Sequence, residues 1–206
     1  MPRSTVRRRL LAGVAAVICG CAGRPSDADG DGNGDTTGGA NVSQSDTPAH
    51  GDVEQDGELT LASMAFSDGE RIPEKYGHDA ANVNPPLTID GVPEDARSLA
   101  LIVDDPDAVD PAGKVWVHWL VWNIAPGREQ IPEDWRPDDA LEGENDFGTV
   151  GYGGPSPPDA EHTYRFKLYA LDEQLGLTEG ATKGELGAAM EGAVLAQTQI
   201  TGTYAP

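Results

Sequence analysis

The chain has 206 residues, with 35 acidic and 14 basic side chains, so its formal net charge at pH 7 is −21. Such a surplus of negative charge repels the phosphates of nucleic acid and excludes a nucleic-acid-binding protein. The surplus is typical of a salt-adapted, halophilic protein, because molar salt screens the self-repulsion of its surface over about 3 Å.

The N-terminus has the order of an export signal. Three arginines at 7–9 precede an apolar stretch at 10–18, and small residues follow at 19–23. The apolar stretch is shorter than the ~20 residues that span a bilayer, so a signal peptide over residues 1–20 is favoured over a permanent transmembrane helix. The paired arginines favour the twin-arginine route, although Sec export also tolerates them.

Residues 18–21 resemble a lipobox, in which cleavage before Cys21 frees a thiol and an amine for lipid attachment. Both cysteines of the chain, Cys19 and Cys21, lie in this segment, so the mature domain has no disulfide to stabilise it. Because a single acyl chain binds a membrane weakly, stable anchoring needs the diacyl form. We therefore expect an extracytoplasmic protein anchored to the membrane at Cys21, with simple secretion as the alternative.

Residues 21–58 are rich in Gly, Asp, Ser and Thr and have no hydrophobic period, which predicts an acidic, disordered tether. The Asp-x-Asp-x-Asp-Gly run that starts at Asp27 matches half of a calcium loop, but Gly38 stands where a bidentate Glu is required. We therefore expect no metal there. Asn41 begins an Asn-Val-Ser sequon and is a candidate glycosylation site.

From residue 59 onward, apolar runs of strand length recur between turns rich in Pro and Gly. This pattern predicts one mainly β domain over residues 59–206. The predicted strands cover residues 59–64, 98–103, 115–124, 164–171 and 197–204.

The run 115–124 is apolar on both alternating faces, so we expect a strand that is covered on both sides. The strand from Tyr164 alternates apolar residues with Arg165 and Lys167, which predicts one side in water. Strict alternation along 115–124 gives one face with Trp116, His118, Leu120, Trp122 and Ile124, and a second face with Val117, Trp119 and Val121.

One helix is predicted near the C-terminus. Thr182 and Glu185 have the spacing of a capping box, which marks where it begins. Its apolar stripe is formed by Leu186, Ala189, Met190, Ala193 and Val194.

His118 is an imidazole in apolar surroundings, where burial lowers a histidine's pKa and a nearby carboxylate raises it. Asp105 and Asp107 follow directly on the strand 98–103, with a proline fixing the backbone between them. Either carboxylate is placed to accept a proton from His118 and so hold its tautomer. A purely structural histidine and turn-forming aspartates are the alternatives.

Residues 148–158 form a loop unusually rich in Gly and Pro. Glycines let backbone N–H groups approach a ligand closely and prolines stiffen the walls, so the loop is a candidate anion-binding nest. His162 and Tyr164 follow within a few residues. A Walker-type phosphate loop is excluded because no Gly-Lys-Ser/Thr follows, whereas a rigid surface loop is the alternative.

Four motifs occur in order: Asp-Pro-Asp-Ala at 105–108, Trp-Val-His-Trp-Leu-Val-Trp-Asn-Ile at 116–124, Asn-Asp-Phe-Gly at 145–148 and Gly-Tyr-Gly-Gly-Pro-Ser-Pro-Pro at 151–158. Together they resemble the phosphatidylethanolamine-binding protein family, and most closely its prokaryotic Raf-kinase-inhibitor-like branch. The resemblance implies an antiparallel β-sandwich with a few peripheral helices and a pocket that accepts phosphate-like anions.

The resemblance also implies which residues line that pocket and what they do. The imidazoles and the tyrosine hydroxyl donate to anion oxygens, the carboxylates orient the imidazoles or meet an ammonium group, and the glycine backbone completes the cradle. Thr163 stands where the family commonly has Arg, which removes a positive charge beside the pocket. The implied lining residues are Asp105, Asp107, Trp116, His118, Gly153, Pro157, His162 and Tyr164.

We therefore expect an exported, lipid-anchored binding protein for a small anion such as phosphate or a phospholipid head group. One alternative is an inhibitor of a protease or kinase, with an unidentified protein target. A second is a metal-dependent or acid–base hydrolase, because two His and two Asp supply acids, bases or metal ligands. Ser156 lies between prolines and lacks a glycine-flanked elbow, so we expect no enzyme and no cofactor.

Overall fold

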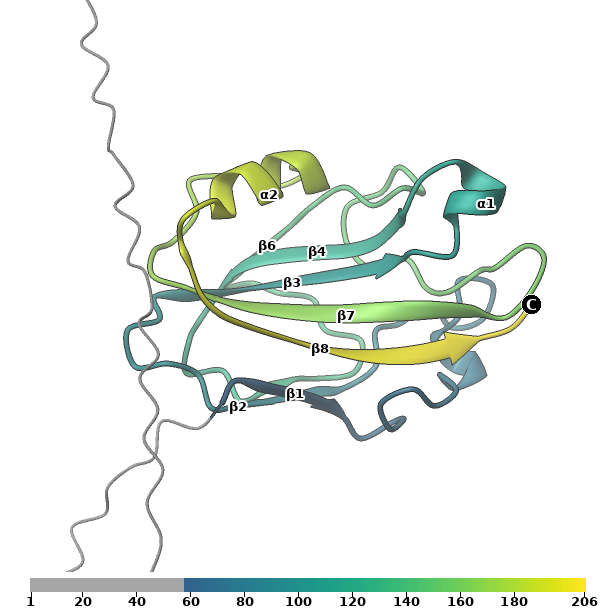
Figure 1. The fold of residues 1–206 in the computed structure, drawn as a ribbon, viewed down its shortest axis with the longest axis horizontal. Coiled ribbons are helices and arrows are strands. Elements are labelled where there is room, and N and C mark those ends of the chain that lie inside the picture. The colour runs from purple at the N-terminus through teal and green to yellow at the C-terminus, as the bar shows by residue number, and fades with distance from the viewer. Residues whose placement is uncertain (1–57) are drawn as a thin grey trace, which may run out of the picture. The chain divides into compact units, whose positions relative to one another are not determined.

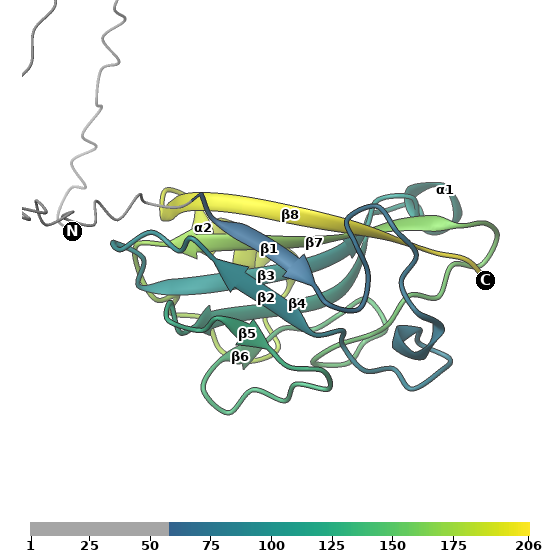
Figure 2. The ribbon, with the colours of Figure 1, turned by 90° about the horizontal axis from the view of Figure 1, so that it is seen from below.

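The computed structural model describes residues 58–206, which form two antiparallel β-sheets packed face to face (Figure 1, Figure 2). This arrangement confirms the predicted antiparallel sandwich. The export signal, the lipidation of Cys21, the tether and the sequon at Asn41 are predictions that lie outside the described residues.

The larger sheet has five strands in the order β6-β4-β3-β7-β8, and the smaller has three in the order β1-β2-β5. The larger sheet consists of β6 (Leu141–Glu142), β4 (Trp116–Ile124), β3 (Ser98–Asp105), β7 (His162–Leu171) and β8 (Val194–Tyr204). The smaller sheet consists of β1 (Thr60–Ser63), β2 (Leu87–Asp90) and β5 (Gln130–Ile131).

The helical elements are short and peripheral. They are a 3₁₀ turn η1 (Glu74–Tyr76), α1 (Val109–Ala112) and α2 (Lys183–Met190). Within residues 58–206, no helix is both long enough and apolar enough to cross a bilayer.

Two hydrophobic clusters hold the layers together. The first lies between the sheets, where Leu61 of β1 meets Phe166 of β7 and the inward-facing residues of β3 and β4. The second lies on the outer face of the larger sheet, where Leu186 and Met190 of α2 pack with Trp122. The central strands β3 and β4 are therefore covered on both faces, as predicted for residues 115–124.

The predicted wet side of β7 is confirmed. Every second residue from His162 to Ala170 is buried, and the residues between them, including Arg165 and Lys167, are only partly buried. This alternation places one row of side chains in the core and the other on the outer face of the sheet.

The prediction that side chains along β4 alternate strictly between two faces is wrong, because bulges interrupt the pairing of β4 with β3. Val103 pairs with Trp119 while the next residue, Asp104, pairs with Val117, so His118 is an extra residue in the ladder. Val117 therefore packs with the outer cluster, and His118 turns inward, where its ring centroid lies 5.1 Å from that of Tyr164. A bulge re-aims a side chain in this way.

The second irregularity of β4 lies near its end, where Asn123 has a left-handed backbone with φ 58°. Ile124, which alternation places on the face of Trp122, packs instead between the sheets. The two-residue period of a strand holds only over the uninterrupted segment between the two bulges.

Helix α2 begins as predicted but ends earlier. Glu185 N–H donates to Thr182 Oγ1 and Thr182 N–H donates to the Glu185 carboxylate, which completes the capping box. The predicted continuation to Ala193 and Val194 is wrong, because Gly192 adopts φ 84° and the chain leaves the helix after Met190. Val194 instead opens β8.

Candidate functional site

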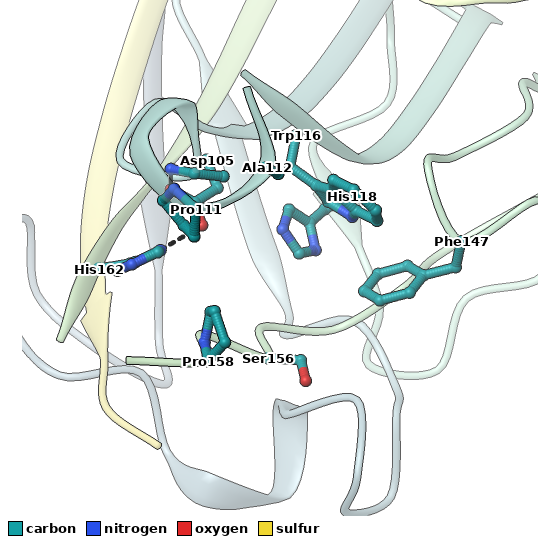
Figure 3. A pocket seen from close by; sticks show the side chains of 10 residues that line it. Asp105, Pro111, Ala112, Trp116, His118, Phe147, Ser156, Pro158 and His162 are labelled. Carbon is teal, nitrogen blue, oxygen red and sulfur yellow. Dashed lines mark hydrogen bonds and ion pairs between the residues drawn. The ribbon is translucent and has the colours of Figure 1, made fainter. Parts of the chain in front are cut away.

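A cavity of about 170 Å³ lies at the edge of the sandwich where β3 ends and where β4 and β7 begin (Figure 3). Because β3 is antiparallel to both neighbours, these three strand ends meet at one edge of the larger sheet. Helix α1 and the loops after β6 complete the walls. The lining residues are Asp105, Ala108, Pro111, Ala112, Trp116, His118, Phe147, Ser156, Pro158 and His162.

Asp105 and His162 form a buried ion pair in the wall of the cavity (Figure 3). His162 Nδ1 lies 2.7 Å from Asp105 Oδ2, and the two side chains are 5% and 4% exposed. The other carboxylate oxygen, Oδ1, accepts the backbone N–H groups of Asp107 and Ala108 at 2.8 and 3.1 Å. The turn into α1 therefore fixes the carboxylate that orients the imidazole.

His162 has a carboxylate on each ring nitrogen. Its Nε2 lies 3.0 Å from Asp159 Oδ1, opposite the contact with Asp105. Burial opposes the charged imidazole, but the two carboxylates outweigh burial and raise the pKa of His162 above its ordinary value. His162 therefore holds its charge to higher pH than a free histidine, and both its nitrogens are engaged within the fold.

His118 is in the opposite electrostatic situation. Its Nδ1 donates to the carbonyl of Gly153 at 2.7 Å, which assigns the second nitrogen, Nε2, to the unprotonated position of the neutral ring. Burial lowers the pKa of His118, against the raising influence of that carbonyl and of the Asp105 charge. The fold therefore favours the charged form of the His162 imidazole and the neutral form of the His118 imidazole.

The prediction that Asp105 or Asp107 accepts the proton of His118 is wrong. Asp105 pairs with His162, and Asp107 Oδ2 accepts the backbone N–H of Thr163 at 2.8 Å. A backbone carbonyl, not a carboxylate, fixes the tautomer of His118.

The prediction of an anion-binding nest is wrong for the central glycines of the loop. The N–H of Gly153 donates to the carbonyl of His118 and the N–H of Gly154 donates to Asn82 Oδ1, both at 2.8 Å. Both N–H groups already have partners within the domain, so neither is free to bind an anion. The absence of a side chain serves packing, since a Cβ on Gly153 would lie 2.6 Å from the ring of Phe147.

Three buried polar atoms around the cavity make no hydrogen bond to residues 58–206: Trp116 Nε1, Tyr164 Oη and His78 Nδ1. Trp116 lines the cavity, the Tyr164 ring contacts His118, and the His78 ring stacks on Phe147 with centroids 4.1 Å apart. Burying an unpaired polar atom costs about 1–3 kcal/mol, so a bound molecule that supplied partners to these three atoms would remove that cost.

The structure brings four of the eight predicted site residues to the cavity surface: Asp105, Trp116, His118 and His162. The other four lie behind that surface. Gly153 and Tyr164 support His118, Asp107 holds the start of β7, and Pro157 is buried while its neighbours line the cavity.

Sequence reasoning missed Phe147 and Asp159. Phe147 lies within the Asn-Asp-Phe-Gly motif, but nothing in the motif shows that its ring reaches Trp116 and His118. Asp159 had a readable signal, since a carboxylate three residues before His162 is within reach of its ring.

The similarity to known proteins covers nearly all of the residues that the structure describes. A family model described as phosphatidylethanolamine-binding protein matches residues 62–205. A UPF0098 protein of Methanothermobacter thermautotrophicus is 48% identical over 151 residues, which cover 71% of this chain and 98% of that protein.

Two solved structures are also similar. The putative phosphatidylethanolamine-binding protein homologue CT736 of Chlamydia trachomatis is 42% identical with a TM-score of 0.68, and the match covers 71% of this chain and 97% of that one. YbcL of E. coli, described as a member of the mammalian family, is 32% identical with a TM-score of 0.67, and the match covers 72% of this chain and 98% of that one.

Proposed function

The chain belongs to the phosphatidylethanolamine-binding protein family, and from this premise we propose that its cavity binds a small anion such as phosphate or a phospholipid head group. The observation that carries the proposal is the presence of two polar atoms without partners on the cavity wall. His118 Nε2 has no hydrogen bond to residues 58–206, and the indole N–H of Trp116 is buried without a partner among them. The indole N–H donates to a ligand oxygen, and His118 Nε2 does the same once it is protonated.

Proton uptake at His118 accompanies anion binding in this proposal. The neutral ring presents a lone pair at Nε2, which repels an anionic oxygen, whereas the protonated ring donates to it. A bound anion therefore raises the pKa of His118, which burial lowers in the free protein. It follows that affinity increases as the pH falls through the raised pKa of the bound state toward the lowered pKa of the free protein.

Phosphate is expected to protect the wild-type domain against heat more strongly at pH 5.5 than at pH 8. A ligand at 100 times its Kd stabilises a protein by about 2.7 kcal/mol, which raises the melting temperature by several degrees. His118→Ala removes the protonated donor, so the protection should disappear. Melting curves recorded in molar KCl with and without phosphate measure both effects.

A matched control is Gln174→Ala, which changes an exposed side chain that does not line the cavity. Its melting temperature should respond to phosphate as the wild type does. Equal protection of the His118→Ala protein, or protection that grows with pH, would contradict the proposed role of the imidazole.

We propose binding rather than hydrolysis for this site. The nearest polar partner of Ser156 Oγ is the exposed carboxylate of Asp79 at 3.5 Å, not an imidazole that would take its proton. The two imidazoles are held in turn by other groups, His118 by a carbonyl and His162 by carboxylates. Among residues 58–206 neither imidazole is bonded to Ser156 Oγ, which supports a binding site.

We further propose that the chain is exported and anchored by a diacyl lipid at Cys21, as the basic, apolar and lipobox-like segments of its sequence indicate. Cys21→Ser is expected to move the protein from the membrane fraction to the soluble fraction and to remove the lipid mass. Cys19→Ser is the matched control and should stay in the membrane. A membrane-bound Cys21→Ser protein would contradict the anchor.

A further inference from the structure

We propose that Asp159 is a specificity-determining residue, whose carboxylate occupies the anion position on His162 and must be displaced when an anion binds. The inference rests on the proposed function of the cavity and adds the residue that sets its affinity. In this arrangement the Asp159 carboxylate competes with an external anion for His162.

The two carboxylates on His162 are held very differently. The carboxylate of Asp105 is 4% exposed and accepts two backbone N–H groups in addition to the imidazole. The carboxylate of Asp159 is 56% exposed, and its only hydrogen bond to residues 58–206 is the 3.0 Å contact with Nε2. Asp105 is therefore a fixed partner, whereas Asp159 is exchangeable.

Asp159 is linked to the cavity wall through its chain neighbour and through His162. It directly follows Pro158, which lines the cavity, and precedes β7 by a short segment. The contact with His162 is local, three residues apart in sequence, so rotation of the Asp159 side chain breaks it without any change in the sheet. A partly exposed ion pair gains little net stability, because water competes for both charges.

The charges around His162 explain why an anion requires this displacement. The imidazolium faces Asp105 from β3 and Asp159 from the loop before β7, while His118 from β4 is neutral at neutral pH. With both carboxylates in place, the group has one more negative than positive charge and repels an oxyanion. When Asp159 rotates away, the charged N–H of His162, a residue of the cavity wall, becomes available as a donor.

The test is Asp159→Asn, which removes the negative charge and preserves the shape of the side chain. Isothermal titration with inorganic phosphate at pH 6 in molar KCl is expected to show binding about tenfold tighter than in the wild type. Glu161→Gln is the matched control, since it removes one negative charge from an exposed side chain of the same segment. Its affinity should lie within about twofold of the wild type.

A second measurement does not depend on ligand binding. The pKa of His162, followed by NMR in the phosphate-free protein, should fall in Asp159→Asn because one of the two carboxylates that stabilise the imidazolium is gone. The Glu161→Gln protein should titrate as the wild type does.

The outcomes separate this inference from the proposed function. If the wild type binds phosphate and Asp159→Asn binds it equally or more weakly, the inference is overturned and the function stands. Weaker binding of phosphoethanolamine to Asp159→Asn would mean that Asp159 holds an ammonium group, which also overturns it. An unchanged His162 titration overturns it as well. If phosphate binds to none of these proteins at any pH, both the proposed function and this inference are contradicted.

Discussion

Asp104→Asn is expected to lower the free energy of unfolding by about 3 kcal/mol, because it leaves three cations without their shared anion. Asp104 is fully buried on the outer face of the larger sheet. Arg165 Nε donates to Oδ1 at 2.8 Å, and the ammonium groups of Lys167 and Lys183 each donate to Oδ2 at 2.6 Å. The cluster connects β3, β7 and α2.

The size of this effect follows from the exposure of the partners. Removing one member of a fully buried ion pair costs about 3–5 kcal/mol, since the remaining charge stays unsolvated. Arg165, Lys167 and Lys183 are 31%, 17% and 33% exposed, so water recovers part of their solvation in the variant. The lower end of that range is therefore expected.

The pH dependence of the stability loss in Asp104→Asn tests whether the negative charge of Asp104 is its cause. Burial opposes ionisation of Asp104, but the three cations outweigh it and hold its pKa below the ordinary value of an aspartate. A carboxyl whose folded pKa is lowered contributes stability above its unfolded pKa of about 3.9, and the contribution is lost as the pH falls further. The difference between wild type and Asp104→Asn should therefore be full at pH 7 and shrink below about pH 4.

Urea unfolding in molar KCl measures this difference, and Asp172→Asn is the control. Asp172 is an exposed carboxylate just after β7, so its replacement should change stability by less than about 0.5 kcal/mol. If the Asp104→Asn domain were as stable as the Asp172→Asn domain, the ion pairs of Asp104 would contribute nothing to the free energy of unfolding.

Asp105→Asn is expected to lower stability by about 3 kcal/mol below pH 6 and by much less at pH 9. Its amide oxygen retains the two backbone hydrogen bonds of Asp105, but its NH₂ group faces His162 Nδ1 and favours the neutral imidazole. The variant therefore loses what the carboxylate contributes to the charged form of His162.

The sign of the pH effect is opposite to that for Asp104. The folded pKa of His162 is raised, so its contribution is fully present below the unfolded pKa of about 6.5 and is lost as the pH rises through the folded value. Urea unfolding of wild type and variant at pH 6 and pH 9 measures the change.

Asp107→Asn provides the comparison for this second effect. Within residues 58–206 its carboxylate accepts only the backbone N–H of Thr163, so its replacement should cost about 1 kcal/mol at both pH values. A stability difference for Asp105→Asn that is the same at pH 6 and pH 9 would show that His162 is not the group through which Asp105 acts.

The long strands and the helix start were predictable because their signals are local. The apolar runs at 98–103 and 115–124 are long enough for a period to be recognised, and the capping box marks the start of α2. Strands β5 and β6 have two residues each, which is too few for any period. Only the neighbouring strands define them.

The candidate site was predictable in its residues and not in their pairing. Asp105 lies 57 positions before His162, and the register between β3 and β7 decides that these two meet. His118 follows both predicted carboxylates within a short stretch of sequence, yet its inward turn depends on a bulge that no residue type indicates. The directions of the Gly153 N–H and carbonyl groups likewise follow from the folded loop.

The extra residue at His118 also links the regularity of β4 to the cavity wall. Between Val117 and Trp119 the strand carries one position more than the partner strand requires. Loss of that single position would make this part of the ladder regular while leaving every residue of β3 and β7 in place. Deletion of this one position would therefore remove His118 from the cavity wall without changing the length of β3 or β7.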